Sequence, residues 1–280
     1  MSVRILVTGG NSGIGLALCK QLAARGCRVF MGTRSKERGA AALSSIADAL
    51  GADVAARIEP IQLDVADDAS VQAAAASLRS SNVVLYALVN NAGIGLNSGP
   101  GHVETLLNTN FVGPKRCSEA FLDVIDPDAG RIVNVSSGSA SMWLRGQSAE
   151  IKQIFTSADT SWELLAATVQ RESGSASMGG YGLSKAGLTA YTIQQAKKYP
   201  NLVCTSLSPG FIQTKMTAGF GARLTPEQGT VSLLKCLFED VVSGYYYGSD
   251  GLRSPLTVTR DPGTPEYGGE DDPDASRYNN

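Results

Sequence analysis

The chain has 280 residues, of which 43% are hydrophobic and 18% are charged, and its formal net charge at pH 7 is −2. This composition predicts a soluble globular protein and excludes the strongly basic surface that a nucleic-acid or anionic-membrane binder needs. The N-terminal residues lack the layout of a signal peptide, and no run of about 18 apolar residues predicts a membrane span.

The cysteines of the chain are scattered, odd in number and without a C-x-x-C pair. This pattern indicates neither a disulfide framework nor a zinc site, so we expect no metal and a reducing, cytoplasmic compartment. The five residues are Cys19, Cys27, Cys117, Cys204 and Cys236.

Short apolar, β-branched runs alternate with alanine-rich amphipathic stretches along most of the chain. Strands are predicted over residues 3–8, 27–32, 56–65, 83–91, 130–137 and 202–210, with a last one beginning at 245–247. Helices are predicted over residues 13–25, 35–50, 68–80, 102–125, 179–198 and 226–240. Continuous apolar strands separated by helices indicate an α/β fold with a parallel sheet covered on both faces.

No linker or internal repeat divides the chain, so we expect a single domain over residues 1–280. Its end, about 252–280, is predicted to be an irregular tail. Prolines, glycines and acidic residues concentrate there, which indicates a flexible or loosely attached segment.

The sequence TGGNSGIG (8–15) follows the first predicted strand and opens the first predicted helix. Glycines in this position let the backbone turn tightly and let a phosphate approach the N–H groups of the helix start. The context predicts a dinucleotide-binding loop, with a tight strand–helix turn that needs glycine only for its conformation as the alternative. The residues of this predicted loop are Gly9, Asn11, Ser12, Gly13, Ile14 and Gly15.

No acidic residue sits at the tip of the second predicted strand, where NAD-binding folds place a carboxylate for the ribose 2′-hydroxyl. Arg34 occupies this region, with Lys36 and Arg38 close behind. A guanidinium pairs with a 2′-phosphate in a bidentate way, and a positive charge at a helix start otherwise opposes the helix dipole. Arg34 therefore favours NADPH/NADP+ over NADH, the alternative being that these cations are simply solvated.

A series of short motifs runs through the first 250 residues or so. They are TGGNSGIG (8–15), LDV (63–65), NNAG (90–93), NTNFVG (108–113), VNVSS (133–137), YGLSK (181–185) and SPGFIQT (208–214). With these motifs in this order, the chain resembles the short-chain dehydrogenase/reductase family. The resemblance implies a Rossmann-type, doubly wound, mostly parallel sheet of about seven strands with helices on both faces. It also implies an oxidoreductase that uses a nicotinamide dinucleotide.

The resemblance implies a catalytic set of Asn110, Ser137, Tyr181 and Lys185. Tyr181 corresponds to the general acid that protonates the substrate oxygen, and Ser137 to the serine that stabilises that oxygen. Lys185, one helical turn after Tyr181, corresponds to the lysine that binds the nicotinamide ribose, and its charge is expected to lower the phenol pKa. Asn110 corresponds to the asparagine of a proton relay. The alternative is a set of ordinary helix and strand-end residues.

The same resemblance implies a second set of residues around the cofactor. Asp64 and Val65 correspond to residues that flank the adenine, and Ile212 and Thr214 to residues that hold the nicotinamide carboxamide. The rest of this set comprises Asn90, Ala92, Gly93, Pro209 and Gly210, while Tyr181 and Lys185 also contact the cofactor.

Two further side chains are singled out by their positions. Phe211 follows a Pro-Gly pair where the family places a substrate-facing aromatic, with a core position as the alternative. His102 is the only histidine, and we expect it in a surface loop, so a Ser-His-Asp hydrolase is not indicated.

Ser137 and Tyr181 are separated by 43 residues, far more than in typical family members. The insert, about 138–178, carries apolar residues at helical spacing and predicts two short amphipathic helices with a cap at SADTSWE (157–163). A similar insert marks the monomeric carbonyl reductase branch, where it would cover the tyrosine helix and block an oligomer contact. We therefore expect a monomer, and the alternative is a substrate lid.

The sequence leaves three candidate functions for this protein. The first is an NADPH-dependent carbonyl reductase that acts on small-molecule aldehydes, ketones or quinones, with no nucleic-acid or membrane partner. The second is an NADP-dependent alcohol dehydrogenase of the steroid or terpenoid type, working in the oxidative direction. The third is a non-catalytic NADPH-binding sensor, which would not need Ser137 or a tuned Tyr181.

Overall fold

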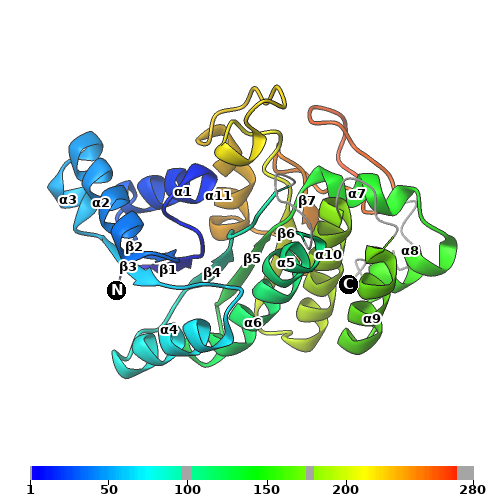
Figure 1. The fold of residues 1–280 in the computed structure, drawn as a ribbon, viewed down its shortest axis with the longest axis horizontal. Coiled ribbons are helices and arrows are strands. Elements are labelled where there is room, and N and C mark those ends of the chain that lie inside the picture. Colours follow the sequence, from blue (N-terminus) through cyan, green and yellow to red (C-terminus); the bar gives the residue numbers. More distant parts are fainter. Residues whose placement is uncertain (1, 96–101, 175–179, 270–280) are drawn as a thin grey trace.

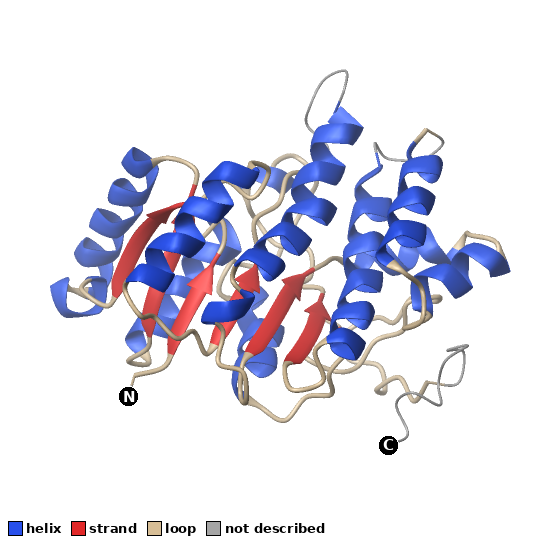
Figure 2. Cartoon of the chain, turned by 90° about the horizontal axis from the view of Figure 1, so that it is seen from below, coloured by secondary structure: helices blue, strands red, loops and turns tan. Residues whose placement is uncertain are grey.

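The computed structural model describes residues 2–95, 102–174 and 180–269. The described strands are β1 (Arg4–Val7), β2 (Arg28–Thr33), β3 (Ile58–Gln62), β4 (Ala87–Asn90), β5 (Arg131–Val135), β6 (Val203–Leu207) and β7 (Tyr246–Tyr247). They form one seven-stranded sheet in the order β3-β2-β1-β4-β5-β6-β7, in which all six strand pairings are parallel. The predicted doubly wound α/β fold is therefore confirmed (Figure 2).

Helices cover both faces of this sheet (Figure 1). The main helices are α1 (Gly13–Ala24), α2 (Lys36–Leu50), α3 (Ala52–Ala55), α4 (Asp68–Ser80), α5 (His102–Leu107), α6 (Gly113–Ala120), α7 (Gly138–Arg145), α8 (Ala149–Thr156), α9 (Trp162–Ser173), α10 (Tyr181–Lys198) and α11 (Val231–Phe238). Shorter turns are η1 (Asn108–Val112), η2 (Leu122–Val124), η4 (Lys215–Thr217) and η5 (Gln228–Thr230). Helices α1, α2 and α11 pack on one face, and α4, α6 and α10 on the other.

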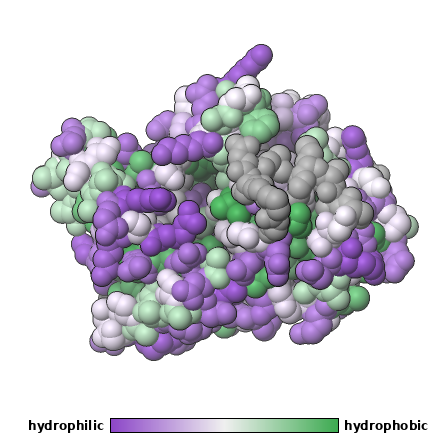
Figure 3. All heavy atoms as spheres, in the orientation of Figure 1, coloured by the Kyte–Doolittle hydropathy of each residue, from purple (hydrophilic) through white to green (hydrophobic). Residues whose placement is uncertain are grey.

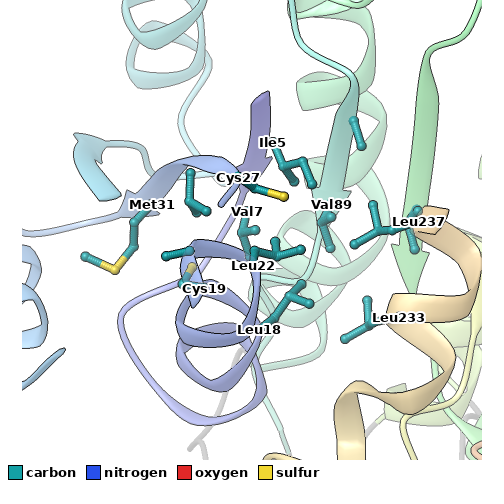
Figure 4. Packing of buried hydrophobic residues seen from close by; sticks show 14 of the residues in the cluster. Ile5, Val7, Leu18, Cys19, Leu22, Cys27, Met31, Val89, Leu233 and Leu237 are labelled. Atoms are coloured by element: carbon teal, nitrogen blue, oxygen red, sulfur yellow. The ribbon is translucent and has the colours of Figure 1, made fainter. Parts of the chain in front are cut away.

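The core follows from the alternation of side chains along each strand. Ile5 and Val7 of β1 point into the layer beneath α1 and α11, where they meet Leu22 and Leu233 (Figure 4). Leu6, between them, points into the opposite layer. Because successive residues of a strand face opposite sides, an unbroken apolar run such as ILV is required when both faces are covered.

The order of the strands places a crevice at the carboxyl end of the sheet. Strand β1 pairs with both β2 and β4, so the chain crosses from β3 over to the far side of β1. The loops that follow β1 and β4 therefore run in opposite directions. Ligands of open α/β sheets bind at this switch point.

The insert after Ser137 is helical, as predicted, with α8 and α9 joined by a capped turn. The Ser161 hydroxyl oxygen accepts a hydrogen bond from the Leu164 amide and caps α9. The insert packs against α10 through its own apolar cluster, in which the Trp162 ring stacks on Phe111 with centroids 4.7 Å apart. Helix α7 precedes these two and was not predicted. Residues 175–178 of the predicted insert lie outside the described residues.

The C-terminal strap, residues 252–269, differs from the predicted loose tail. It has little regular structure, yet it contains Arg253 at 8% and Ser254 at 7% exposure, and it folds back onto α7 through a hydrogen bond from Ser141 to the Pro255 carbonyl (2.7 Å). Composition could not reveal this attachment, because it depends on the contacts of two arginines, Arg253 and Arg260, with residues elsewhere in the chain. Residues 270–280 of the predicted tail lie outside the described part of the chain.

The outer surface agrees with the composition. Hydrophilic side chains dominate the face shown in Figure 3, and three clusters of buried apolar residues form the interior. Within the described residues, no helix combines the length and the apolar character that crossing a bilayer demands.

Candidate active site

The first cleft is an open hollow of ≈ 500 Å³ at the switch point between β1 and β4. Loops after six different strands and the start of α10 line it, so residues far apart in sequence are brought together. The predicted residues that line it are Gly9, Asn11, Ser12, Gly13, Ile14, Gly15, Arg34, Asp64, Val65, Ala92, Gly93, Pro209, Thr214, Tyr181 and Lys185.

The glycine loop needs its glycines for close approach. Gly9 has φ +64°, and a Cβ there would lie 2.9 Å from the Ala92 Cα. A Cβ on Gly15 would lie 2.5 Å from the Gly9 carbonyl oxygen. Side chains at these positions would therefore displace backbone, which goes beyond the conformational requirement of a simple turn.

The start of α1 is open to an anion. Ser12 is its N-cap, with extended backbone, and among the described residues no side chain accepts from the first N–H groups of this helix. The first turn contains no acidic residue that would repel a phosphate. Free N–H groups at a positive helix end fit the pyrophosphate of a dinucleotide.

Two guanidinium groups stand at the rim of the first cleft beyond β2. Arg34 and Arg38 both line the cleft and are exposed, whereas Lys36 between them does not line it. The Ser35 hydroxyl accepts from the Arg38 amide (3.3 Å) and caps α2, which places Arg38 in the first turn of this helix, just after Arg34. The sequence analysis mentioned Arg38 without assigning it to the site, although its closeness to Arg34 in the sequence was the available signal.

The adenine-side residues are partly as expected. The Asp64 carboxylate accepts from the Ala66 amide (3.0 Å), which holds the loop after β3 beside the cleft. Asn90, in contrast, lies with its side chain inside the protein, 2% exposed and donating to the Asn134 side chain (2.8 Å). The neighbouring Asn91 faces the first cleft and donates to the Thr8 carbonyl (2.8 Å). Asn91, the first residue after β4, therefore lines the first cleft in place of the predicted Asn90.

Two residues of SPGFIQT also lie away from the first cleft. The Ile212 side chain is 2% exposed and packs directly against Gly229, where an added Cβ would lie 3.0 Å from it. Gly210 has φ +92° and lines a second cleft instead.

The second cleft is a hollow of ≈ 490 Å³ lined by α7, the loop after β6, the end of β7 and the C-terminal strap. Ser137 is among its lining residues. Phe211 lines it at 51% exposure, so this ring is not a core residue. Because the Tyr181 phenol hydrogen-bonds Ser137, the two clefts meet at this pair of side chains.

The electrostatics of Tyr181 differ from the expectation. Burial raises the pKa of Tyr181 above its usual value, and the hydrogen bond with Ser137 opposes this only in part. The Lys185 ammonium lies 5.9 Å from the centre of the Tyr181 ring and donates to the Val135 carbonyl (2.9 Å). The net direction is therefore opposite to the one predicted, because loss of solvation dominates.

Lys185 itself is strongly perturbed. It is 4% exposed, and burial lowers its pKa from 10.5 to about 8. At neutral pH the side chain is still mainly an ammonium. It therefore offers donors on the floor of the first cleft.

Asn110 sits in a local distortion that sequence could not reveal. Residues Asn108–Val112 form a π-helical turn between α5 and α6, a feature that recurs at functional sites. The Asn110 amide donates to the Ile94 carbonyl (2.9 Å), and its oxygen accepts from the Ile94 amide (2.9 Å). A Cβ on Gly93 would lie 3.2 Å from Asn110 Oδ1 and 3.5 Å from Lys185 Nζ, so Asn110 and Lys185 flank the same glycine.

His102 is not in a surface loop. It begins α5 and is 9% exposed, and neither ring nitrogen has a hydrogen-bond partner within the described residues. The expectation of a surface loop failed because the polar side chain is enclosed by the fold. Across all the described residues, no cluster of His, Cys, Asp and Glu that would hold a metal ion is found.

A parallel sheet with a glycine loop at its switch point and a Tyr–Lys pair beside it is the arrangement of a dinucleotide-dependent oxidoreductase. The model of the short chain dehydrogenase family matches residues 4–149. The chain is 33% identical over 265 residues to (+)-neomenthol dehydrogenase of Arabidopsis thaliana, covering 81% of this chain and 88% of that protein. It is 34% identical over 252 residues to carbonyl reductase (NADPH) 1 of Homo sapiens, covering 80% of this chain and 86% of that protein.

The solved structure of salutaridine reductase from Papaver somniferum superposes with a TM-score of 0.76 at 27% identity, covering 88% of this chain and 99% of that one. The chain belongs to the short-chain dehydrogenase family and is an oxidoreductase of it, as its motifs predicted. A nicotinamide dinucleotide is the cofactor that this membership implies.

Proposed function

We propose that the protein is an NADPH-dependent carbonyl reductase for aldehydes, ketones or quinones. The observation that carries this proposal is the meeting of the two clefts at the Ser137–Tyr181 pair. The first cleft has the anion-binding loop for a dinucleotide, and the second offers a separate space for a small molecule. A reacting carbonyl would lie between them, within reach of both hydroxyl groups.

When bound, the nicotinamide dinucleotide supplies the hydride. Ser137 stabilises the carbonyl oxygen on which negative charge develops. Its own oxygen accepts from the Ser139 amide (3.2 Å), which leaves the hydroxyl proton for the substrate. Tyr181 donates its phenolic proton to the same oxygen.

Lys185 and Asn110 would support this proton donor. The Lys185 ammonium would bind the nicotinamide ribose and help to restore the proton on Tyr181. Asn110 holds the backbone at Ile94 through two hydrogen bonds and lies next to Lys185 across Gly93. A water on this side of Gly93 would link the two side chains to solvent.

The state of Tyr181 suits a proton donor. A phenol with a raised pKa keeps its proton at neutral pH and can act as the acid of carbonyl reduction. The oxidative alternative, an alcohol dehydrogenase of the terpenoid or steroid type, is supported by the name of the Arabidopsis relative. A pure NADPH sensor would have no use for the Ser137–Tyr181 pair.

The preference for NADPH over NADH rests on Arg34 and Arg38. Both guanidiniums line the first cleft beside the end of β2, where the ribose 2′-position is expected. They fit a phosphate there. Among the described residues that line the first cleft, Asp64, on the adenine side, is the only one with a carboxylate.

We also propose that the enzyme acts as a cytoplasmic monomer. The insert covers α10, with Trp162 packed edge-on against Tyr191 at 5.4 Å, so this helix face has no surface left for a second copy. The five cysteines are buried and free, which suits a reducing compartment.

The decisive test follows NADPH oxidation with an α-dicarbonyl, a quinone, an aromatic aldehyde and a cyclic ketone. Tyr181→Phe should lower kcat by about 10²–10⁴-fold while NADPH binding persists. Tyr191→Phe is the matched control, because it removes a buried hydroxyl from the same helix away from both clefts. Equal activity of Tyr181→Phe and the wild type would refute the proposed acid, and binding without turnover of any carbonyl would favour the sensor.

A further inference from the structure

The C-terminal strap forms one wall of the second cleft. It runs beside α7 at the carboxyl end of the sheet (Figure 1) and contributes Ser254, Pro255, Thr259 and Arg260 to the lining. The opposite rim carries Phe211 and other apolar side chains. A substrate in the cleft would therefore contact the strap on its side away from Ser137.

One end of the strap is fixed by Arg253. This residue is 8% exposed, and its guanidinium lies over the Tyr245 ring at 4.2 Å and the Tyr267 ring at 5.0 Å. Its Nη1 donates to the Gly268 carbonyl (3.1 Å). Cation–π contacts of a buried arginine on two rings resist displacement of the strap.

Arg260 fixes the middle of the strap and uses every hydrogen-bond donor that a guanidinium has. Nε donates to the Pro265 carbonyl (2.8 Å), and Nη2 to the Thr264 carbonyl (2.6 Å) and to Asp250 Oδ2 (2.7 Å). Nη1 donates to Asp250 Oδ1 (3.0 Å) and to the Ser254 hydroxyl (3.4 Å). The side chain is 6% exposed and its N–H groups are all used, so it has no spare donor for a ligand.

Asp250 matches this arginine. Its carboxylate also accepts from the Leu252 amide (3.2 Å) and the Gly263 amide (3.0 Å). Burial alone would raise the pKa of Asp250, but the hydrogen bonds from Arg260 and the two amides hold it at about 2. The carboxylate is therefore ionised, and the pair is neutral as a unit, at any working pH.

The charge balance of the second cleft follows from this pair. Among the described residues that line it, Arg260 is the only cation, and Asp261 is the only other charged residue. Asp261 is exposed at the rim, where it repels anions. A carboxylate on a substrate would lose water there and find no free cation among the described lining residues to pair with it.

We propose that the C-terminal strap is a specificity wall: the Asp250–Arg260 pair cancels the one cation of the second cleft, so that the enzyme accepts neutral carbonyl compounds and rejects those bearing a carboxylate. This inference rests on the proposed function and adds the charge class of its substrates.

The experiment compares 4-methylbenzaldehyde with 4-carboxybenzaldehyde, which differ in charge at the end away from the reacting carbonyl. The wild type should prefer the methyl compound in kcat/KM by at least about tenfold. Asp250→Asn leaves Arg260 uncompensated and with free donors, and should reduce this preference by about tenfold or more, mainly through KM for the carboxylate. The affinity for NADPH should not change.

Two further variants separate charge from loosening of the strap. The double variant D250N/R260Q removes both charges, so preference for the methyl compound should return. Asp123→Asn is the matched control, because it breaks a comparable two-bond arginine pair with Arg79 (2.6 and 2.9 Å) far from either cleft. If Asp250→Asn keeps the wild-type preference for the methyl compound, and its thermal unfolding shows that the fold is retained, the proposal is overturned.

Failure of the proposed function gives a different result. If no aldehyde is reduced, calorimetric titration of the two aldehydes into the NADP+-loaded protein decides the charge rule alone. Binding of the methyl compound but not the carboxylate supports the strap proposal even without turnover. Equal binding of both, or binding of neither, contradicts it.

Discussion

Removal of Arg34 should weaken NADPH binding without affecting NADH. The guanidinium stands at the rim of the first cleft, exposed to water, so its interaction with a 2′-phosphate is screened. A charge-assisted hydrogen bond in such a place contributes about 1.4 kcal/mol, the lower end of the range for charged partners. This corresponds to about a tenfold increase in KM for NADPH in Arg34→Ala.

The same argument applies to Arg38, one helical turn later. Arg38→Ala should raise KM for NADPH by a similar factor, and the double variant by about 100-fold if the two guanidiniums act independently. The assay is initial-rate kinetics with one good carbonyl substrate and varied NADPH or NADH, together with binding measured by quenching of protein fluorescence.

Lys36→Ala is the control for this prediction. It removes a cation between the two arginines from a position that does not line the first cleft. KM for NADPH should therefore change less than twofold or so. An equal loss for NADH in Arg34→Ala, or an equal effect of Lys36→Ala, would refute a specific contact with the 2′-phosphate.

Three other predictions concern stability. Burial depresses the Lys185 pKa from 10.5 to about 8, so between these pH values the folded state binds fewer protons than the unfolded state, and the free energy of unfolding rises with pH. Relative to Lys185→Met, the wild type should gain at most about 3 kcal/mol of unfolding free energy across this window in denaturant titrations. A difference between the two proteins that stays constant with pH would contradict the assigned pKa. Gly9→Ala should cost about 2 kcal/mol or more and abolish cofactor binding, because backbone must move at φ +64°; Gly26→Ala, at φ +88° with open space, should cost only about 1 kcal/mol and spare binding. Trp162→Ala should lower the free energy of unfolding by about 3 kcal/mol and cause association of the protein that light scattering detects. Leu164→Ala, at a position 49% exposed, should change neither stability nor association.

Much of the fold and of the first cleft could be predicted because both depend on local patterns. The apolar runs of β1 and β5 end in Thr8 and Ser136, and parallel strands bring such ends to one edge of the sheet. The motifs at strand ends were therefore bound to lie near one another once the strand order was known. The family resemblance supplied that order.

The features that sequence reasoning missed depend on direction and on pairing over long distances. Whether Asn90 or Asn91 faces the first cleft is decided by the register of β4 against β5, in which Asn90 lies opposite Asn134. The strap is held because Arg260 meets Asp250 and Arg253 meets Tyr245 and Tyr267, contacts that composition does not encode. The π-helical turn at Asn110 likewise has no local signature in a sequence that is otherwise helical.

The insert has a consequence for the chemistry as well as for assembly. Its first helix, α7, begins directly at Ser137, whose hydroxyl caps it through the Ser139 amide. The same helix packs on the start of α10 so closely that a Cβ on Gly182 would lie 2.9 Å from the Ser139 carbonyl oxygen and from the Trp143 Cβ. Gly182 is the neighbour of Tyr181, so the close packing of α7 on α10 fixes the serine relative to the tyrosine. Covering α10, through Trp162 of α9, and positioning the Ser137–Tyr181 pair, through α7, are therefore two results of the same insert, and a lid that opened by moving α7 would separate the pair.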